Sequence, residues 1–344
     1  MLKKLVLLLI IGVIVAGGGA LWLRHRMSAP YRAFAAAEVF VELAPGSSFA
    51  AIGTQLADAG VVPDALTFRL AARLSGADRR LQAGEYRFAG EQSTFQVVWR
   101  LANGDVYTRP VTFPEGLTIR EMASVFERAG LGTAAAFEKS AADRSLGAAI
   151  DPGLRSLEGY LFPDTYPLPR RAGPDTAVRA MIARFGQVFD DTLRREAAAQ
   201  GLSMHQAVTL ASLIEKETAK PDERPIVSAV YHNRLERGMP MQCDPTVIYA
   251  LMRAGRWNGN LRRADLQLDS PYNTYRYPGL PPGPIAAPGR GSLEAAVRPA
   301  DVPYLYFVSR NDGSHVFATT LEEHNRNVVK WQKEYFRQKV GSEK

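Results

Sequence analysis

Apolar residues are most concentrated at the N-terminus. The run from Leu5 to Leu23 contains no charged residue, and two lysines precede it. A helix of this length, rising about 1.5 Å per residue, matches a hydrocarbon core of about 30 Å, so the pattern predicts one membrane-spanning helix. A cleaved signal peptide is the alternative, because AGGGA at 16–20 resembles a small-residue cleavage site. Arg24 and Arg26 follow the run and weaken the charge difference that sets orientation.

Two later segments share one pattern of apolar and polar positions. They begin at Val41 and Val111, and each continues through a Pro/Gly turn into an amphipathic stretch that ends at glycine. This order predicts a short strand, a turn and a helix in each copy. The matched pairs are Gly46 and Gly116, Ala59 and Ala129, Gly60 and Gly130, Phe49 and Ile119, Ile52 and Met122, and Leu56 and Phe126.

The first copy opens a small predicted unit. A helical pattern runs from Pro63 to Leu74, a strand-like one starts at Leu81, and another helical one covers about Phe95 to Leu101. The resulting order is β-α-α-β with one helix appended. This order and size resemble a LysM module, a small glycan-binding fold. A packing or spacer unit without a ligand would give the same pattern.

From about Arg155 onward the pattern predicts mainly helices, a long loop and a hairpin. The segment from Ser270 to Ser292 is too rich in proline and glycine for a regular element, and its apolar side chains argue against disorder. NDGS between two apolar runs indicates a β-hairpin. The predicted helices cover about 174–200, 203–220 with a Ser203/Gln206 capping box, 223–237, and 322–340.

Composition and charge exclude several kinds of site. The net charge of +7 favours an anionic neighbour, such as a membrane surface or an acidic polymer. The single cysteine, Cys243, excludes an intramolecular disulfide and a cysteine metal cluster. The histidine spacing fits no metal motif, and there is no P-loop and no G-x-S-x-G elbow. We therefore expect no metal, no cofactor and no nucleic-acid partner.

Two glutamates in ASLIEKET, from Ala211 to Thr218, are the main candidates for chemistry. Helix positions three, four and seven apart share a face. A buried carboxyl group has a raised pKa, which suits a general acid. Behind Glu217 on its face lie the large apolar residues Leu210, Leu213 and Ile214, and behind Glu215 lie the smaller set Val208, Ala211 and Ser212. The pattern therefore favours Glu217 as the buried acid, unless the helix end frays into solvent before Pro221.

A glutamic acid that protonates a leaving oxygen points to cleavage of a glycosidic bond. Most hydrolases of this kind use a second carboxylate about 5 to 9.5 Å away, and Glu158, Asp164 and Asp244 are the candidates. A route with one carboxylate is also open, in which a hydroxyl of the sugar attacks and the same glutamate acts as acid and then as base.

Several motifs resemble, in order, those of the endolytic murein transglycosylase family, also called MltG or YceG-like. They are LQAGEYRF, EGYLFPDTY, LASLIEKET, RPIVSAVYHNRL, MQCDPTVIYAL, SPYNTY, GLPPGPIAAPG and YLYFVSRNDGSHVFATTLEEHN. The resemblance runs from the anchor to about Val328. It implies cleavage of the β-1,4 bond between N-acetylmuramic acid and N-acetylglucosamine in nascent peptidoglycan, with formation of a 1,6-anhydro end. The family's catalytic glutamate is the second of E-K-E-T, which is Glu217 here.

The same motifs contain the residues that we expect to bind substrate. Asn273 and Tyr275 would contact an acetamido group or a sugar ring from the proline-rich loop. Asn233 would face the glutamate from its own helix. The remaining candidates are Gln242, Asp244 and Thr246, on a short connection, and Glu158 in EGYLFPDTY. Each has a structural alternative, such as an internal hydrogen bond, a turn or a core position. Cys243 departs from the family, in which Thr, Ser or Ala is more frequent.

The resemblance completes the predicted organisation as an α+β protein with a mixed α/β catalytic domain. It implies a single-pass inner-membrane protein with a cytoplasmic N-terminus, a periplasmic body, peptidoglycan strands as substrate, and a peptidoglycan polymerase (a penicillin-binding protein) as partner. A non-catalytic glycan-binding scaffold and a two-carboxylate muramidase are the alternatives. The predicted divisions are 1–26 for the cytoplasmic tip and anchor, 27–37 for a linker, 38–105 for the LysM-like subdomain, 106–154 for a bridging strand–helix unit and 155–344 for the catalytic domain.

Overall fold

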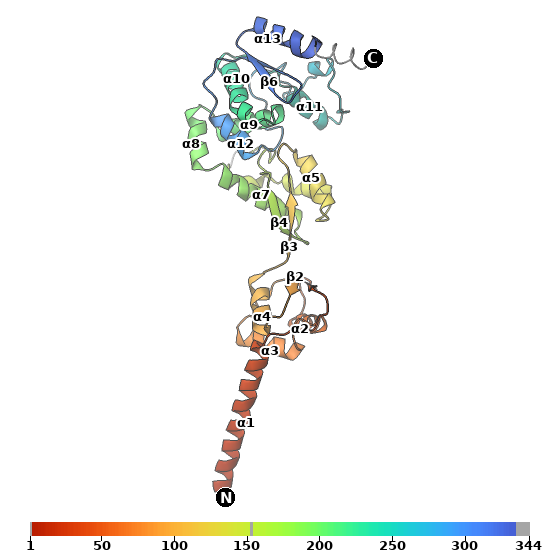
Figure 1. Cartoon of the computed structure of the whole chain (residues 1–344), viewed down its shortest axis with the longest axis vertical. Coiled ribbons are helices and arrows are strands. Elements are labelled where there is room, and N and C mark those ends of the chain that lie inside the picture. The colour runs from red at the N-terminus through yellow and green to blue at the C-terminus, as the bar shows by residue number, and fades with distance from the viewer. Residues whose placement is uncertain (1, 152–153, 335–344) are drawn as a thin grey trace. The chain divides into compact units, whose positions relative to one another are not determined.

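The computed structural model describes residues 2–151 and 154–334 and contains two compact units (Figure 1). The first comprises Met1–Pro110 with Pro167–Arg171, and the second comprises Val111–Tyr166 with Ala172–Lys344. Both combine helices with two-stranded sheets, so the chain has a mixed α/β fold. The 106–154 region thus belongs mainly to the same compact unit as the segments that follow it. The predicted divisions themselves stay predictions.

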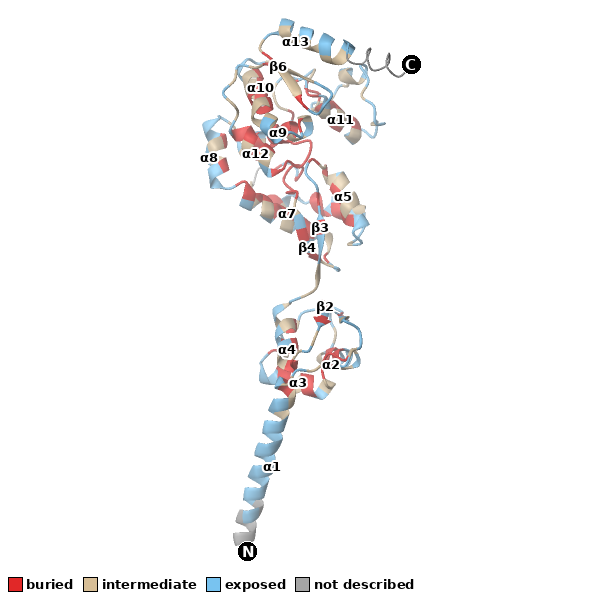
Figure 2. Ribbon diagram, in the orientation of Figure 1, coloured by how far each residue is buried: buried red, intermediate tan, exposed pale blue. Residues whose placement is uncertain are grey.

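Helix α1, Leu2–Ser28, begins the first unit. Large apolar side chains such as Leu9, Ile14 and Trp22 are exposed on it, and Figure 2 colours most of its ribbon as exposed. The segment Leu9–Ser28 is the one described helix that is long and apolar enough to cross a membrane. This agrees with the predicted anchor. At its C-terminal end Met27 is buried in the core of the unit. Arg26 forms an ion pair of 2.7 Å with Asp64, which is the N-cap of helix α3, Ala65–Leu74.

The remainder of the first unit has the predicted β-α-α-β order with one added helix. Strands β1 and β2 pair antiparallel, and their alternating side chains pack with the helices around a core that includes Tyr86 and Phe68. Side-chain caps begin each helix, among them a complete capping box between Ser93 and Gln96. The elements are β1 Glu38–Leu43, α2 Phe49–Asp58, α3 Ala65–Leu74, β2 Gly84–Ala89 and α4 Thr94–Asn103. The likeness to a LysM module stays a prediction.

The second copy of the repeat also forms a strand, a turn and a helix. Gly46 and Gly116 occupy the same place in the two turns, and both have positive φ values, 79° and 76°, which glycine adopts without strain. The second copy pairs with a later strand, so the repeat is local and does not build one symmetric sheet. Its elements are β3 Thr108–Thr112 and α5 Ile119–Arg128, followed by α6 Ala134–Ala141 and by β4 Thr165–Pro169, the partner of β3.

The helix predicted over 174–200 is in fact two helices. α7, Pro174–Val188, ends before α8, Asp191–Ala199. The break has a local cause, because the side chain of Asp190 accepts hydrogen bonds from the backbone N–H groups of Thr192 and Leu193. An aspartate in this position starts a new helix by satisfying its free N–H groups. Apolar periodicity alone continues across both helices and therefore did not show the break.

Helix α9, Met204–Glu217, lies in the middle of the second unit, where Figure 2 shows mostly buried ribbon. The predicted capping box between Ser203 and Gln206 is confirmed. All eight positions from Ala207 to Ile214 are buried, because other helices pack on several sides of α9. The helix ends where Thr218 becomes extended. The packed neighbours are α8, α10 Arg224–Glu236, α11 Asp244–Arg253 and α12 Arg290–Val297.

A β-hairpin follows the proline-rich loop, as predicted. Strands β5, Tyr306–Ser309, and β6, His315–Ala318, pair antiparallel. The final predicted helix is present as α13, Leu321–Val328, and continues as a π-helical segment, Val329–Glu334. The rest of the predicted helix, up to Val340, lies outside the described residues. Short 3₁₀ turns occur at Arg144–Gly147, Pro221–Glu223 and Asp265–Gln267.

Candidate active site

Glu217 is the last residue of α9, and its carboxylate has two side-chain partners. The hydroxyl of Tyr231 donates a hydrogen bond of 3.0 Å to Glu217 Oε1, and the thiol of Cys243 also forms a hydrogen bond with the carboxylate. Burial raises the pKa of Glu217, and this effect exceeds the opposing effect of the two hydrogen bonds. The negative charge of Asp244 adds to the rise, whereas His315 opposes it. The arrangement favours a protonated carboxyl group.

The carboxyl group of Glu217 opens into a cavity of about 390 Å³. Segments that are distant in sequence form its walls: the ends of α9 and α10, the connection before α11, the proline-rich loop and the β5–β6 hairpin. The polar lining residues include Arg234, Gln242, Asp244, Tyr275, Ser309, His315 and His324. An acid at the base of a cavity that carries several hydrogen-bonding groups is suited to act on a polar substrate.

Three of the predicted binding residues lie together in this cavity. Tyr275 donates a hydrogen bond of 2.5 Å to Oδ1 of Asp244, the first residue of α11. Gln242 has a left-handed φ of 51°, which is strained for a residue other than glycine, and its N–H donates to the carbonyl of Thr274. Its exposed side chain is therefore held at the wall of the cavity by the backbone. Contact of these three residues with substrate stays a prediction.

Thr246 and Asn273 are buried and support the wall without lining it. The hydroxyl of Thr246 donates 2.7 Å to the carbonyl of Cys243 and lies 2.9 Å from the hydroxyl of Thr274. Asn273 donates to the carbonyls of Leu266 and Leu268, and its own oxygen accepts from the N–H of Tyr275. Thr246 thus fixes the proline-rich loop against the start of α11, and Asn273 fixes the same loop against the segment at 266–268. We expected Asp244 and Thr246 on a short connection, but the structure places both in the first turn of helix α11.

Asn233 does not face Glu217. Its amide donates two hydrogen bonds of 2.9 Å, to the carbonyls of Val302 and Tyr304. The row of α10 that reaches Glu217 is instead Val227, Tyr231 and Arg234, which lies one residue further along than the row of Ile226, Val230 and Asn233. The structure thus replaces Asn233 with Tyr231 as the partner of the glutamate.

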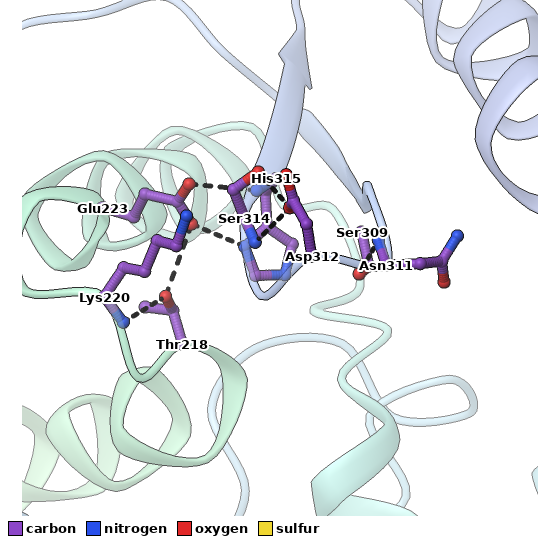
Figure 3. A network of polar contacts seen from close by, with 8 residues as sticks. All are labelled: Thr218, Lys220, Glu223, Ser309, Asn311, Asp312, Ser314 and His315. Carbon is purple, nitrogen blue, oxygen red and sulfur yellow. Dashed lines mark hydrogen bonds and ion pairs between the residues drawn. The ribbon is translucent and has the colours of Figure 1, made fainter.

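A carboxylate–histidine pair holds the β-hairpin beside the end of α9 (Figure 3). The two oxygens of Glu223 accept from the N–H of His315 at 3.0 Å and from its Nδ1 at 2.7 Å. The hydroxyl of Thr218 donates to the same carboxylate at 3.4 Å. Because Nδ1 is bound to Glu223, Nε2 is the nitrogen of His315 that remains for the cavity it lines. Burial opposes ionisation of Glu223, but the bonds from His315 outweigh it and lower the pKa.

Glu215 is not a solvated residue at the margin of the helix. Its side chain is 8% exposed, and Oε2 accepts hydrogen bonds from Ser292 Oγ at 2.6 Å and from the N–H of Gly289 at 3.0 Å. These donors belong to the start of α12, where the unpaired N–H groups of a helix favour a negative charge. The sequence pattern predicts that Glu215→Gln is nearly silent. The structure predicts a cost in stability.

Two of the candidate second carboxylates do not line the cavity of Glu217. Glu158 accepts from the N–H of Ile119 at 2.9 Å and from the hydroxyl of Tyr249 at 3.2 Å, and lines a separate cavity. Asp164 binds Arg184 at 2.8 Å. Asp244 alone of the three candidates lines the cavity with Glu217. Burial raises the pKa of Glu158 to about 7, although both hydrogen bonds oppose the rise.

Glu158 should make the stability of the fold depend on pH. Its pKa is about 7, against 4.5 for an ordinary glutamate, so the folded state binds this proton more tightly. The contribution of Glu158 to the free energy of unfolding is complete below the unfolded pKa of 4.5 and is lost as the pH rises through about 7. The total loss is about 3 kcal/mol. Glu158→Gln should remove this loss. Urea unfolding of the detergent-solubilised chain at about pH 5 and about pH 8 measures it, and an equal pH dependence in both proteins would contradict it.

The sequence analysis did not predict three residues of the site: Tyr231, Arg234 and His315. Tyr231 and Arg234 share a buried helix row, so the spacing in RPIVSAVYHNRL is the signal that points to them. His315 carries no such signal, because its position near Glu217 depends on how the hairpin packs. Among the described residues, no three or more His, Cys, Asp or Glu side chains are arranged to hold a metal ion.

The fold and the cavity together define a mixed α/β protein with a buried carboxyl group in a polar cleft. Comparison with known proteins identifies its family: residues 41–330 match the model of the YceG-like family, and the chain belongs to this family. It is 32% identical over 333 residues to the endolytic murein transglycosylase of Bacillus subtilis, covering 91% of this chain and 90% of that protein.

Two further relatives agree with this membership. The endolytic murein transglycosylase of Streptococcus pneumoniae strain R6 is 31% identical over 326 residues, which are 85% of this chain and 58% of that protein. The crystal structure of a YceG-like protein from Listeria monocytogenes superposes with a TM-score of 0.57 at 32% identity. This match covers 84% of this chain and 98% of the Listeria chain.

Proposed function

We propose that this protein is an endolytic murein transglycosylase, which cleaves the bond between N-acetylmuramic acid and N-acetylglucosamine within a glycan strand and leaves a 1,6-anhydro end. The observation that carries the proposal is the carboxyl group of Glu217 at the wall of a polar cavity, where burial raises its pKa and so favours the protonated form that a general acid needs. The names of the Bacillus and Streptococcus relatives support the same activity.

In the proposed mechanism Glu217 serves first as acid and then as base. It donates its proton to the glycosidic oxygen while the bond from C1 to that oxygen breaks, and the N-acetylglucosamine leaves with a free hydroxyl. The 6-hydroxyl oxygen of the muramic acid then forms a bond to C1 and returns its proton to the carboxylate. No water is consumed, and Glu217 is restored. General acid–base catalysis of this kind contributes about 10²–10⁴ to the rate.

The neighbours of Glu217 suit both halves of this cycle. Tyr231 and Cys243 hydrogen-bond to the carboxylate, so they stabilise the ion that exists between the two proton transfers. Tyr231 remains protonated, since burial raises the pKa of its hydroxyl well above its ordinary value. His315, fixed by Glu223, places an imidazole at the cavity wall where it can meet charge or a hydroxyl group of the substrate.

We propose further that α1 anchors the protein in the inner membrane, with a cytoplasmic N-terminus and a periplasmic body in which nascent strands are terminated. A peptidoglycan polymerase is the partner that this role requires. The exposed apolar surface of α1 and its length support the anchor. The proposal that the first unit binds glycan rests on its element order alone.

Analysis of the products tests the proposed function against a muramidase with two carboxylates. The muramidase is the second candidate because Asp244 lines the same cavity as Glu217. Uncross-linked glycan strands are incubated with the protein, and the new ends are measured by mass spectrometry. We expect anhydro ends, which are lighter than reducing ends by the mass of one water. Reducing ends would support the two-carboxylate route, and intact strands would support a binding scaffold.

A further inference from the structure

A second cavity, of about 490 Å³, lies in the same unit as the cavity of Glu217. It shares no lining residue with that cavity. Its walls come from the start of α5, the second half of α11, the start of α9 and the proline-rich loop. Three arginines line it, Arg120, Arg155 and Arg253, together with the ring of Tyr272 and the apolar segment Pro282–Pro284. The proposed mechanism uses none of these residues.

The two cavities are connected by shared elements. Helix α11 begins at Asp244 in the first cavity and ends at Arg253 in the second. At about 1.5 Å per residue, these two ends lie roughly 14 Å apart along the helix. The proline-rich loop contributes Tyr275 to the first cavity and Tyr272 to the second. A molecule that extends over a few sugar units can therefore reach both cavities at once.

The positive charge of the second cavity is not neutralised internally. Among the described residues, none of the three arginines has a carboxylate oxygen within 4.0 Å. The cavity also contains Glu138 and Glu158, but both oxygens of Glu158 already accept hydrogen bonds from Ile119 and Tyr249. Its pKa of about 7 means that Glu158 is only partly charged near neutral pH. The three arginines are exposed to solvent, so the carboxylate of a ligand can reach them without displacing an ion pair.

Arg253 is held in place for such a ligand. Its guanidinium lies over the ring of Tyr272 at 5.1 Å and over that of Tyr249 at 5.9 Å. Arg253 also forms a side-chain hydrogen bond with Tyr272, and the remaining N–H groups at the edge of the guanidinium can donate to the oxygens of a carboxylate. The opposite wall is also fixed, because His205 bonds to the carbonyl of Pro282 at 2.9 Å and to the hydroxyl of Tyr160 at 3.1 Å.

We propose that this arginine-lined cavity binds a carboxylate of the peptide that branches from the glycan strand, while the strand itself occupies the cavity of Glu217. This proposal rests on the proposed function. In an intact strand the lactyl carboxyl group of each muramic acid is joined to its peptide by an amide bond, so the sugars present neutral groups and the free carboxylates belong to the peptide branches. The proline and tyrosine walls supply apolar surface for the aliphatic parts of such a peptide. The cavity thereby distinguishes strands with peptides from bare strands.

Binding measurements with two forms of one ligand test this proposal. The probes are short uncross-linked peptidoglycan oligomers and the same oligomers after amidase removal of their peptides and conversion of the exposed lactyl carboxylates to amides. The protein is the full detergent-solubilised chain carrying Glu217→Gln, so that binding is read without cleavage. In this background, Arg120→Gln/Arg155→Gln and, separately, Arg253→Gln should each weaken binding of the peptide-bearing oligomers at least tenfold. Binding of the peptide-free oligomers should be unchanged, which also shows that the variants fold.

The double variant Arg262→Gln/Arg263→Gln is the matched control, because it removes the same charge from exposed positions outside the cavity. It should leave both affinities near those of the parent. Unchanged affinity for peptide-bearing oligomers in the cavity variants, or an equal loss for both forms of ligand, would overturn the proposal. The products of the wild-type chain are measured separately, so failure of the transglycosylase assignment is distinguishable from failure of the peptide site.

Discussion

Replacement of Glu217 by Gln should lower the rate of strand cleavage by about a thousandfold or more. Glutamine keeps the size of the side chain and can still accept the hydrogen bond from Tyr231, but it has no proton to donate and recover. The expected loss is that of general acid–base catalysis, about 10²–10⁴, and the whole cycle passes through this one group. Release of anhydro-ended fragments from uncross-linked strands, followed by mass spectrometry, measures the rate.

Glu215→Gln is the control for Glu217→Gln, because Glu215 lies in the same helix and the substitution is the same. It retains an acceptor for Ser292 and Gly289 but removes the negative charge at the start of α12, at a cost of about 1 kcal/mol in the free energy of unfolding. We therefore expect lower stability with most of the cleavage rate retained. Wild-type production of anhydro ends by Glu217→Gln would refute the catalytic assignment, whatever Glu215→Gln does.

Arg234→Met should destabilise the second unit by at least about 3 kcal/mol. The guanidinium is buried and donates to the backbone carbonyls of Leu305, Met241 and Pro240, at 2.7, 2.7 and 3.2 Å. Methionine has a similar length but no donor, so three carbonyls lose their partner, each at a cost of about 1–3 kcal/mol where water cannot replace it. Urea unfolding of the solubilised chain measures the effect.

Arg237→Met is the matched control for this prediction. Arg237 is exposed one turn further along, at the end of α10, and the same substitution there should change stability by no more than about 0.5 kcal/mol. Equal effects at the two positions would show that the carbonyl bonds of Arg234 contribute little. The three carbonyls belong to the connection before α11 and to the approach to β5, so the same substitution should also loosen two walls of the Glu217 cavity.

Local signals in the sequence were sufficient for most elements of the fold. The long apolar N-terminal helix, the β-α-α-β order, the repeat of strand, turn and helix, the capping box of α9 and the hairpin all depend on residues close together in the chain. The break at Asp190 was missed because periodicity persists across it, although an aspartate followed by free N–H groups is itself a local start signal.

The candidate site was harder to predict because its partners come from distant segments. The spacing around Glu217 identified a partly buried glutamate, but α9 is covered on several sides, so the side chain of Glu215 is buried as well. Which of the two faces a cavity depends on the packing of α10, α11 and α12. The same dependence explains why Asn233 was preferred to Tyr231, and why Thr246 and Asn273 support the wall of the cavity while Asp244 and Tyr275 line it.

The place of Cys243 beside Glu217 has a consequence for the redox chemistry of the protein. The thiol is fully buried, and burial raises its pKa well above the ordinary value; ionisation of Glu217 during the reaction would raise it further. Oxidants, alkylating reagents and disulfide exchange all require the thiolate, which is scarce under these conditions. An unpaired cysteine would ordinarily be a liability in the oxidising compartment where we propose that the body lies. The burial that raises the pKa of Glu217 thus also keeps the neighbouring thiol chemically inert.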